Sequence, residues 1–197
     1  EAIRQLVNLV NEQKADLIVF TGDLVNQQSH ELDSFKEILS QLHAPGGVYS
    51  VLGNHDYGTY YRWHSRKEEV ANLEYLIEQQ KDMGWKMLNN DHTIIHHKSD
   101  SIALIGVEND GEPPFSQFAD FPKAIQGTEG MFRILLSHNP THWRREVLPD
   151  SDIELTSPDI HMRCKWKCSD IHWPPSYIRS GRACIMKASV HCTSMSV

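Results

Sequence analysis

Three polar segments carry side chains that bind divalent cations, and each follows a short apolar run. The segments are Gly22-Asp23, Gly53-Asn54-His55-Asp56 and Ser137-His138-Asn139-Pro140. A carboxylate can bridge two cations, an amide oxygen is a neutral hard ligand, and imidazole binds transition metals. The ends of these runs thus carry polar residues that are able to bind a metal ion.

The second segment also offers groups for proton transfer. The imidazole of His55 can reach a substrate oxygen, and Asp56 can hold its tautomer and raise its basicity. Each segment alone has a simpler interpretation, because Asn, Asp and Gly are common in turns. The residues that follow can line a cleft or pack as an ordinary loop; they are Tyr57, Tyr60, Tyr61, Trp63 and His64.

The elements that must position these groups alternate along the chain. Apolar residues at helical spacing predict amphipathic helices over 1–14, 32–42 and 67–83. Short apolar runs predict buried strands over 17–21, 48–52, 93–96, 102–107 and 133–137, with a Pro- and Phe-rich loop over 111–122. This alternation indicates an α/β layered fold with a doubly covered sheet, in which ligands bind beyond the carboxyl ends of the strands.

Composition narrows the classes of partner. The chain has 197 residues and a formal net charge of -7. Its overall electrostatic potential would therefore not attract nucleic acid, and no nucleic-acid-binding surface is expected. No apolar run approaches the roughly 20 residues that cross a bilayer. We therefore expect a soluble domain without a membrane segment in this chain.

The motifs, taken in order, resemble those of the calcineurin-like metallophosphoesterases. That family carries Asp-x-His, Gly-Asp-x-x-Asp/Asn, Gly-Asn-His-Asp/Glu, a lone His and then Gly-His-x-His. This chain shows Gly22-Asp23-Leu24-Val25-Asn26, Gly53-Asn54-His55-Asp56 and His138 in the same order. The resemblance covers about residues 1–155.

The resemblance implies both a fold and an activity. The fold would be an αββα sandwich of two mixed β-sheets flanked by helices, here incomplete. The activity would be hydrolysis of a small phosphate ester by a water activated between two metal ions, which can be Mn, Fe, Zn or Mg. By this match Asp23 would bridge both metals and Asn54 and His138 would bind the second. His55, supported by Asp56, would be the general acid or charge stabiliser.

Two family motifs are not visible in the chain. Asp-x-His would lie upstream of Glu1, together with any membrane anchor or export signal. Gly-His-x-His is expected shortly after residue 155, where the chain reads Ser157-Pro158-Asp159-Ile160-His161. Codons exist for which a shift of one reading frame turns 157–165 into a sequence containing Gly-His-Thr-His. We therefore divide the chain into a phosphoesterase core, 1–155, and an aberrant, frameshifted tail, 156–197.

The missing ligands predict an impaired enzyme that holds at most one ion, and that one only partly. Three alternatives stay open: a genuine C-terminal extension, a non-catalytic relic used for protein contacts, and a zinc-binding module in the tail. The zinc module would use residues that gather near the C-terminus: His161, Cys164, Cys168, His172, Cys184, His191 and Cys192. The pair Cys164 and Cys168 has a spacing that zinc sites use.

Overall fold

The computed structural model describes residues 1–97, 100–147, 153, 155–158 and 163–166, which form two mixed four-stranded sheets. The first sheet has the order β3-β2-β1-β8. Its strands are β1 (Leu17–Phe20), β2 (Val48–Ser50), β3 (Lys86–Met87) and β8 (Arg163–Trp166). β1, β2 and β3 are parallel, and β8 pairs with β1 in the antiparallel sense.

The second sheet has the order β4-β5-β6-β7. Its strands are β4 (Asp91–His97), β5 (Asp100–Gly106), β6 (Phe132–Ser137) and β7 (Leu155–Pro158). β4 and β5 form an antiparallel hairpin, whereas β5, β6 and β7 run parallel. The ladder pairs Leu104 with Ile134 and Gly106 with Leu136, so β5 and β6 end at the same edge.

The two sheets pack face to face. Alternate residues of β1, β5 and β6 bury their side chains in a shared core: Leu17, Val19, Ile102, Leu104, Ile134 and Leu136. Residues that face the other way contact helices, as Ile18 does on the first sheet and Leu135 on the second. Nearly all-apolar strands of this kind are expected where both faces of a sheet are covered.

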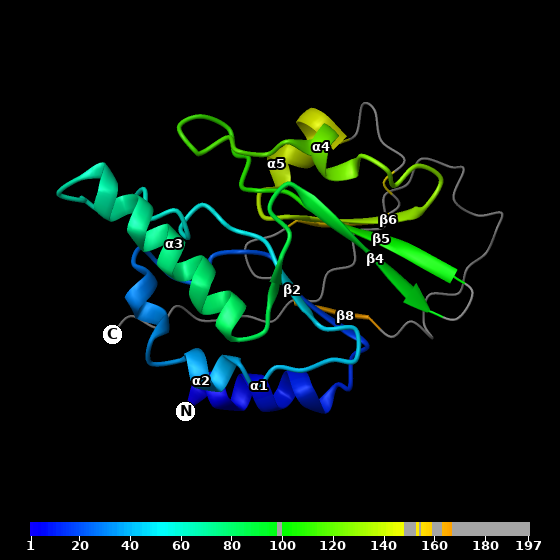
Figure 1. Cartoon of the computed structure of the whole chain (residues 1–197), viewed down its shortest axis with the longest axis horizontal. Coiled ribbons are helices and arrows are strands. Elements are labelled where there is room, and N and C mark those ends of the chain that lie inside the picture. Colours follow the sequence, from blue (N-terminus) through cyan, green and yellow to red (C-terminus); the bar gives the residue numbers. More distant parts are fainter. Residues whose placement is uncertain (98–99, 148–152, 154, 159–162, 167–197) are drawn as a thin grey trace.

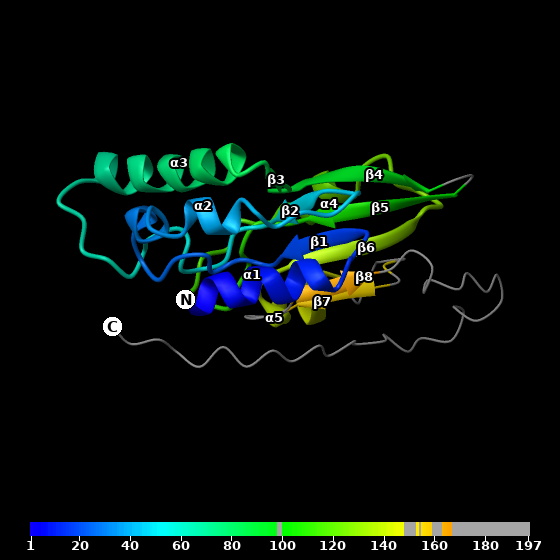
Figure 2. The same cartoon turned by 90° about the horizontal axis from the view of Figure 1, so that it is seen from below.

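Helices form the outer layers. α1 (Ala2–Glu12), α2 (Lys36–Leu39) and α3 (Arg66–Asp82) contribute Val7, Leu39 and Leu76 to the core beside the first sheet. α4 (Phe121–Ile125) contributes Phe121 and Ala124 to the core beside the second. Figure 1 shows α4 and α5 (Pro140–His142) at the top and α1 and α2 at the bottom, with the strands between them. Figure 2 gives the same layers from below, on the side of α1 and α2. The αββα sandwich of two mixed sheets is therefore confirmed.

Several predicted elements differ in detail from those observed. The helix expected over 32–42 is divided into a 3-10 turn, η1 (Ser29–Leu32), and the single turn of α2. The loop expected over 111–122 ends in α4, whose first turn Asp120 caps by accepting a hydrogen bond from the Lys123 amide at 3.1 Å. Asp120 and Pro122 are typical of the first residues of a helix, but the Pro- and Phe-rich composition of 111–122 indicated a loop instead.

The predicted domain boundary falls inside an observed strand. β7 begins at Leu155 and extends the second sheet, and β8 adds to the first sheet, so strands continue past residue 155. The frameshifted tail stays a prediction. Of the residues of the zinc alternative, only the backbone of Cys164 lies within the described part of the chain. Among the described residues, no helix is long and apolar enough to cross a membrane.

Candidate metal centre

The three expected metal ligands arrive from both sheets. Parallel pairing of β1 with β2 brings the segments that carry Asp23 and Asn54 to one edge of the first sheet. His138 follows β6 of the second sheet directly, and the face-to-face packing sets it opposite that edge. The nearest residues in sequence among the three are 31 apart, so tertiary structure alone brings them together.

The ligand atoms themselves converge. Nε2 of His138 lies 2.9 Å from Oδ1 of Asn54 and 3.4 Å from Oδ2 of Asp23. The His138 side chain is 1% exposed and that of Asp23 13% exposed. One nitrogen and two oxygens from three separate segments thus share a nearly enclosed position.

Two glycines permit this close approach. A Cβ on Gly22 would lie 2.6 Å from the Gly53 Cα and 2.9 Å from the His138 Nδ1. A Cβ on Gly53 would lie 2.9 Å from the His138 Cε1 and would also overlap Asp23. Asp23 itself has a φ of 57°, a left-handed conformation that is uncommon for a residue other than glycine. Gly53 is therefore required by the close packing at the site, and Gly22 is required both by that packing and by its φ of 97°.

Neighbouring groups fix the orientation of two ligands. Nδ1 of His138 lies 2.8 Å from the Thr21 carbonyl oxygen, which can only accept, so Nδ1 carries a hydrogen. Nε2 then faces Asn54 and Asp23: with a hydrogen it donates to their oxygens, and without one its lone pair is free to bind a metal ion. Nδ2 of Asn54 donates to the Tyr60 hydroxyl at 2.8 Å, which turns Oδ1 toward His138. Both ligands are thus held with their metal-binding atoms facing the shared position.

The electrostatics of the pair favour a cation. Burial alone would raise the pKa of Asp23, but the hydrogen bond and charge of His138 and the amide of His55 bring it below its ordinary value. Burial alone would lower the pKa of His138, but the hydrogen bond and charge of Asp23 bring it above its ordinary value. An ionised carboxylate therefore lies in a mostly buried position where a proton on the ring, or a metal ion, balances its charge.

The donor set and its spacing fit a divalent ion. Metal–ligand distances of about 2.0–2.2 Å place neighbouring donors about 3.0–3.5 Å apart in octahedral or tetrahedral geometry. The separations of 2.9 and 3.4 Å lie close to that range. Carboxylate, amide and imidazole suit Mn, Fe, Zn or Mg.

Asp56 takes a different position from the one expected. Its carboxylate is 0% exposed and accepts hydrogen bonds from the amides of Asp23, Leu24 and Gly53 at 2.7–2.9 Å, and of Val25 at 3.3 Å. Burial raises the pKa of Asp56 to about 6, the amide bonds oppose that rise, and the charge of Asp23 adds to it. Asp56 thus ties the first metal-binding segment to the second.

The expected support of the His55 ring by Asp56 is replaced by a backbone contact. Nδ1 of His55 lies 2.7 Å from the carbonyl oxygen of Asn26. The His55 amide donates to Oδ1 of Asp23 at 3.0 Å, and the Tyr60 ring lies 4.8 Å from the imidazole. The four amides around Asp56 occupy its two oxygens, which is why its carboxylate supports the backbone and not the ring.

Comparison with known proteins agrees with this geometry. The profile of the family described as calcineurin-like phosphoesterase matches residues 1–164, most of the chain. The chain belongs to the calcineurin-like phosphoesterase family. Its members are metal-dependent phosphoester hydrolases, so the predicted family is confirmed and the expected enzyme class is supported.

Similar proteins share only part of their length with this member of the calcineurin-like phosphoesterases. A transmembrane protein with metallophosphoesterase domain from Danio rerio is 32% identical over 78% of this chain and 34% of its own length. The uncharacterized metallophosphoesterase YkoQ of Bacillus subtilis is 24% identical over 88% of this chain and 57% of its own. The Haemophilus influenzae NAD nucleotidase NadN superposes with a TM-score of 0.52 at 18% identity, covering 81% of this chain and 32% of that one, which shows the shared fold. The chain thus spans about a third to somewhat over half of these proteins.

Sequence reasoning missed the residues that support the site. Thr21 and Asn26 act through backbone carbonyls, which no side-chain pattern predicts. Glu31 accepts hydrogen bonds from the amides of Asn26, Gln27 and Gln28, and from the Asn26 side chain, at 2.8–3.1 Å. Gln28 and Glu31 form a capping box in the structure, but Gln is not among the residues that mark the first position of this motif in a sequence, so the pattern gave little signal.

The aromatic residues after Asp56 differ in their burial and in their contacts. Tyr57 is buried and donates to Glu108 at 3.0 Å, and Trp63 donates to the Gly58 carbonyl at 2.8 Å. Tyr60 and Tyr61 are 46% and 40% exposed. Among these residues, Tyr60 contacts the proposed site: its hydroxyl accepts from Asn54 and its ring packs against His55.

Proposed function

We propose that this chain is the body of a metal-dependent phosphoester hydrolase whose second metal ion is held by Asp23, Asn54 and His138. The observation that carries the proposal is the convergence of Nε2 of His138 with oxygens of Asn54 and Asp23, supplied by both sheets. The substrate proposed is a small phosphate ester.

When bound, two divalent cations would supply a water of lowered pKa and charge to neutralise the phosphate oxygens. The residues of this chain perform the other tasks. Asp23 presents Oδ2 to the shared position, while its Oδ1 accepts a hydrogen bond from the His55 amide at 3.0 Å. The Asn26 carbonyl holds the hydrogen of Nδ1 on His55, so Nε2 is the nitrogen that delivers a proton or stabilises charge at the phosphoryl group.

We further propose that the chain as given is impaired. Of the ligands that the family uses at the first metal, Asp23 is the one visible in the sequence, and a single carboxylate holds a divalent ion weakly. One ion, partly bound at the second position, is therefore expected, and turnover should be slow.

Metal affinity tests the proposed ligands directly. Isothermal titration of the metal-stripped chain with Mn²⁺ should give much weaker binding for Asn54→Ala, by about tenfold or more, since even outer-shell changes cost about 10–100-fold. Asn8→Ala, an exposed position on α1, is the matched control. Equal affinities in the two variants would contradict the ligand assignment.

Activity tests the impairment separately. With Mn²⁺ and an aryl phosphate, the chain should turn over far more slowly than a version extended upstream and restored to the Gly-His-x-His frame. Equal rates for the two versions would show that the additional ligands are not needed.

A further inference from the structure

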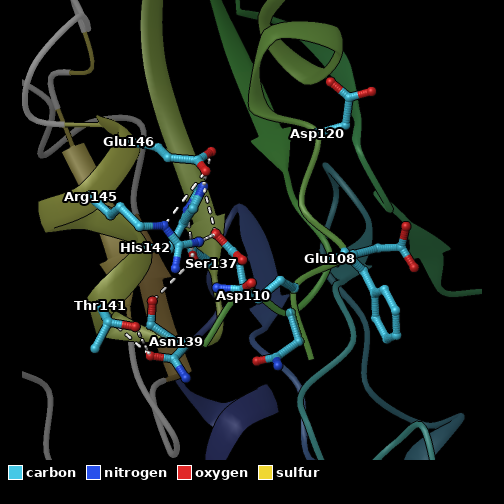
Figure 3. Close-up of polar contacts among 12 residues, drawn as sticks. Glu108, Asp110, Asp120, Ser137, Asn139, Thr141, His142, Arg145 and Glu146 are labelled. Carbon is cyan, nitrogen blue, oxygen red and sulfur yellow. Dashed lines mark hydrogen bonds and ion pairs between the residues drawn. The ribbon is translucent and has the colours of Figure 1, made fainter. Parts of the chain in front are cut away.

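A second group of metal-ligating side chains lies beside the carboxyl end of β6. His142 closes α5, and Glu146 follows in the π-helical turn η2 (Trp143–Val147). Asp110 comes from the segment after β5, the strand paired with β6. Figure 3 shows the His142 ring and the two carboxylates turned toward one another. One ligand atom from each residue lies within 4.8 Å of the others.

The buried ring nitrogen of His142 has no hydrogen-bond partner. The His142 side chain is 0% exposed, and its Nδ1 lies 3.3 Å from the Ser137 hydroxyl oxygen. Nε2 is buried without a hydrogen bond. It lies 3.5 Å from Oε2 of Glu146 and 3.9 Å from Oδ2 of Asp110. An unsatisfied buried polar atom costs about 1–3 kcal/mol, so a ligand that binds this nitrogen would stabilise the fold.

The neighbours of His142 permit a tautomer that presents a lone pair at Nε2. The Ser137 hydroxyl donates to the Asn139 carbonyl at 3.4 Å, so its oxygen is available to accept the hydrogen of Nδ1 on His142. Burial lowers the pKa of His142, although the charges of Asp110 and Glu146 oppose that change. The neutral ring can carry its hydrogen on either nitrogen: the carboxylates alone favour a hydrogen on Nε2, whereas a cation between them would favour a lone pair there.

We propose that Asp110, His142 and Glu146 bind a divalent transition-metal ion, with Zn²⁺ as the best match, at a site separate from the centre formed by Asp23, Asn54 and His138. One imidazole and two carboxylates form a donor set that zinc uses. Nε2 lies 3.5 and 3.9 Å from the two carboxylate oxygens, and all three atoms lie within 4.8 Å of one another. Binding one ion would draw them together to about 3.0–3.5 Å, the separation between neighbouring ligands. π-helical turns frequently occur at functional sites, and here the turn places His142 and Glu146 on one side.

Arg145 balances part of the charge of this site. Its guanidinium contacts Oδ2 of Asp110, and its Nε lies 3.7 Å from Oε1 of Glu146. Two carboxylates and one guanidinium leave a net charge of about -1 around a neutral His142, which a bound cation reverses. Glu146 can bind the ion through Oε2 while Oε1 stays near Arg145.

The test is a Zn²⁺ titration of the metal-stripped full chain by isothermal calorimetry, compared across variants. Glu146→Gln removes one ligand at a side chain that is 40% exposed, so the fold should tolerate it. Glu112→Gln is the control, because it makes the same charge change at an exposed neighbour of Arg145. Any zinc bound by tail cysteines is the same in both variants.

We expect Glu146→Gln to lose one binding event, or to bind at least about tenfold more weakly, while Glu112→Gln matches the parent. Asn54→Ala should keep the same event, which separates this site from the proposed catalytic centre. His142→Gln should repeat the result of Glu146→Gln. Identical isotherms for Glu146→Gln and Glu112→Gln would overturn the proposal and leave an ion-pair network alone.

Discussion

Glu31 offers a sharp test of how the loop behind His55 is held. Its two carboxylate oxygens accept four hydrogen bonds, three from consecutive backbone amides and one from the Asn26 side chain. The carbonyl of Asn26 then contacts Nδ1 of His55. Glu31→Gln replaces one of the oxygens by a group that cannot accept, so two of the four bonds should be lost.

The magnitude follows from the two lost bonds. A hydrogen bond contributes about 0.5–1.5 kcal/mol, and solvent reaches this exposed carboxylate, so we expect a loss of about 1 kcal/mol in the free energy of unfolding. The effect should depend on pH. Burial alone would raise the pKa of Glu31, but its hydrogen bonds bring it below 4.5, the ordinary value. The stabilisation is thus present above pH 4.5 and is lost as the pH falls through the lower, folded-state value.

Urea unfolding, repeated from pH 7 downward, measures the difference in the free energy of unfolding between the parent and the variant, called the gap below. Glu37→Gln on α2 is the control, because it makes the same change at an exposed glutamate in the next helix. The gap should be seen for Glu31→Gln alone and should narrow below pH 4.5. A gap of equal size in both variants, or one that does not change with pH, would refute the reasoning. Nuclear magnetic resonance of the His55 ring should also report a looser Nδ1 contact in Glu31→Gln.

Three other changes probe the site and the core. Gly53→Ala would place a Cβ 2.9 Å from the His138 Cε1, so unfolding in urea should require about 1–3 kcal/mol less and Mn²⁺ binding in calorimetry should weaken; parent-like values would refute the close packing. Leu104→Ala removes a side chain that is 0% exposed between the sheets and should cost about 2–5 kcal/mol in the same unfolding assay, whereas less than 1 would contradict the core assignment. Tyr60→Phe removes the hydroxyl that orients Asn54. Mn²⁺ affinity should therefore fall, but by less than in Asn54→Ala, for which the expected loss is about tenfold or more. An unchanged affinity would exclude this orienting role.

The layered fold was predictable because its signals are strong and local. Apolar runs such as Leu17–Phe20 have no polar face, which indicates strands covered on both sides. The three helices expected from periodicity lie beside the first sheet, although the middle one is interrupted between Leu32 and Lys36. Elements of two to five residues, such as β3 and α4, have too few residues to show a period.

The residues proposed as ligands could be picked out by their types and order, whereas the groups that orient them could not. Asp23, Asn54 and His138 carry donor atoms in their side chains, and each follows a strand. The role of Asp56 depends on amides from two segments far apart in the sequence, residues 23–25 and Gly53, that meet around one carboxylate, and sequence spacing does not encode this. The group around His142 was also missed, since Asp110 is 32 residues away and becomes its neighbour only through the pairing of β5 with β6.

The origin of the ligands in two different sheets has a thermodynamic consequence. An ion bound by Asp23, Asn54 and His138 joins the layers and binds well only while they stay packed. By mass action, a metal concentration of about 100 times the dissociation constant would add about 2.7 kcal/mol to the stability of the assembled sandwich. Conversely, any substitution that loosens the packing between the two sheets should weaken metal affinity, however far it lies from the ion. Metal affinity would then report how well the core between the sheets is packed.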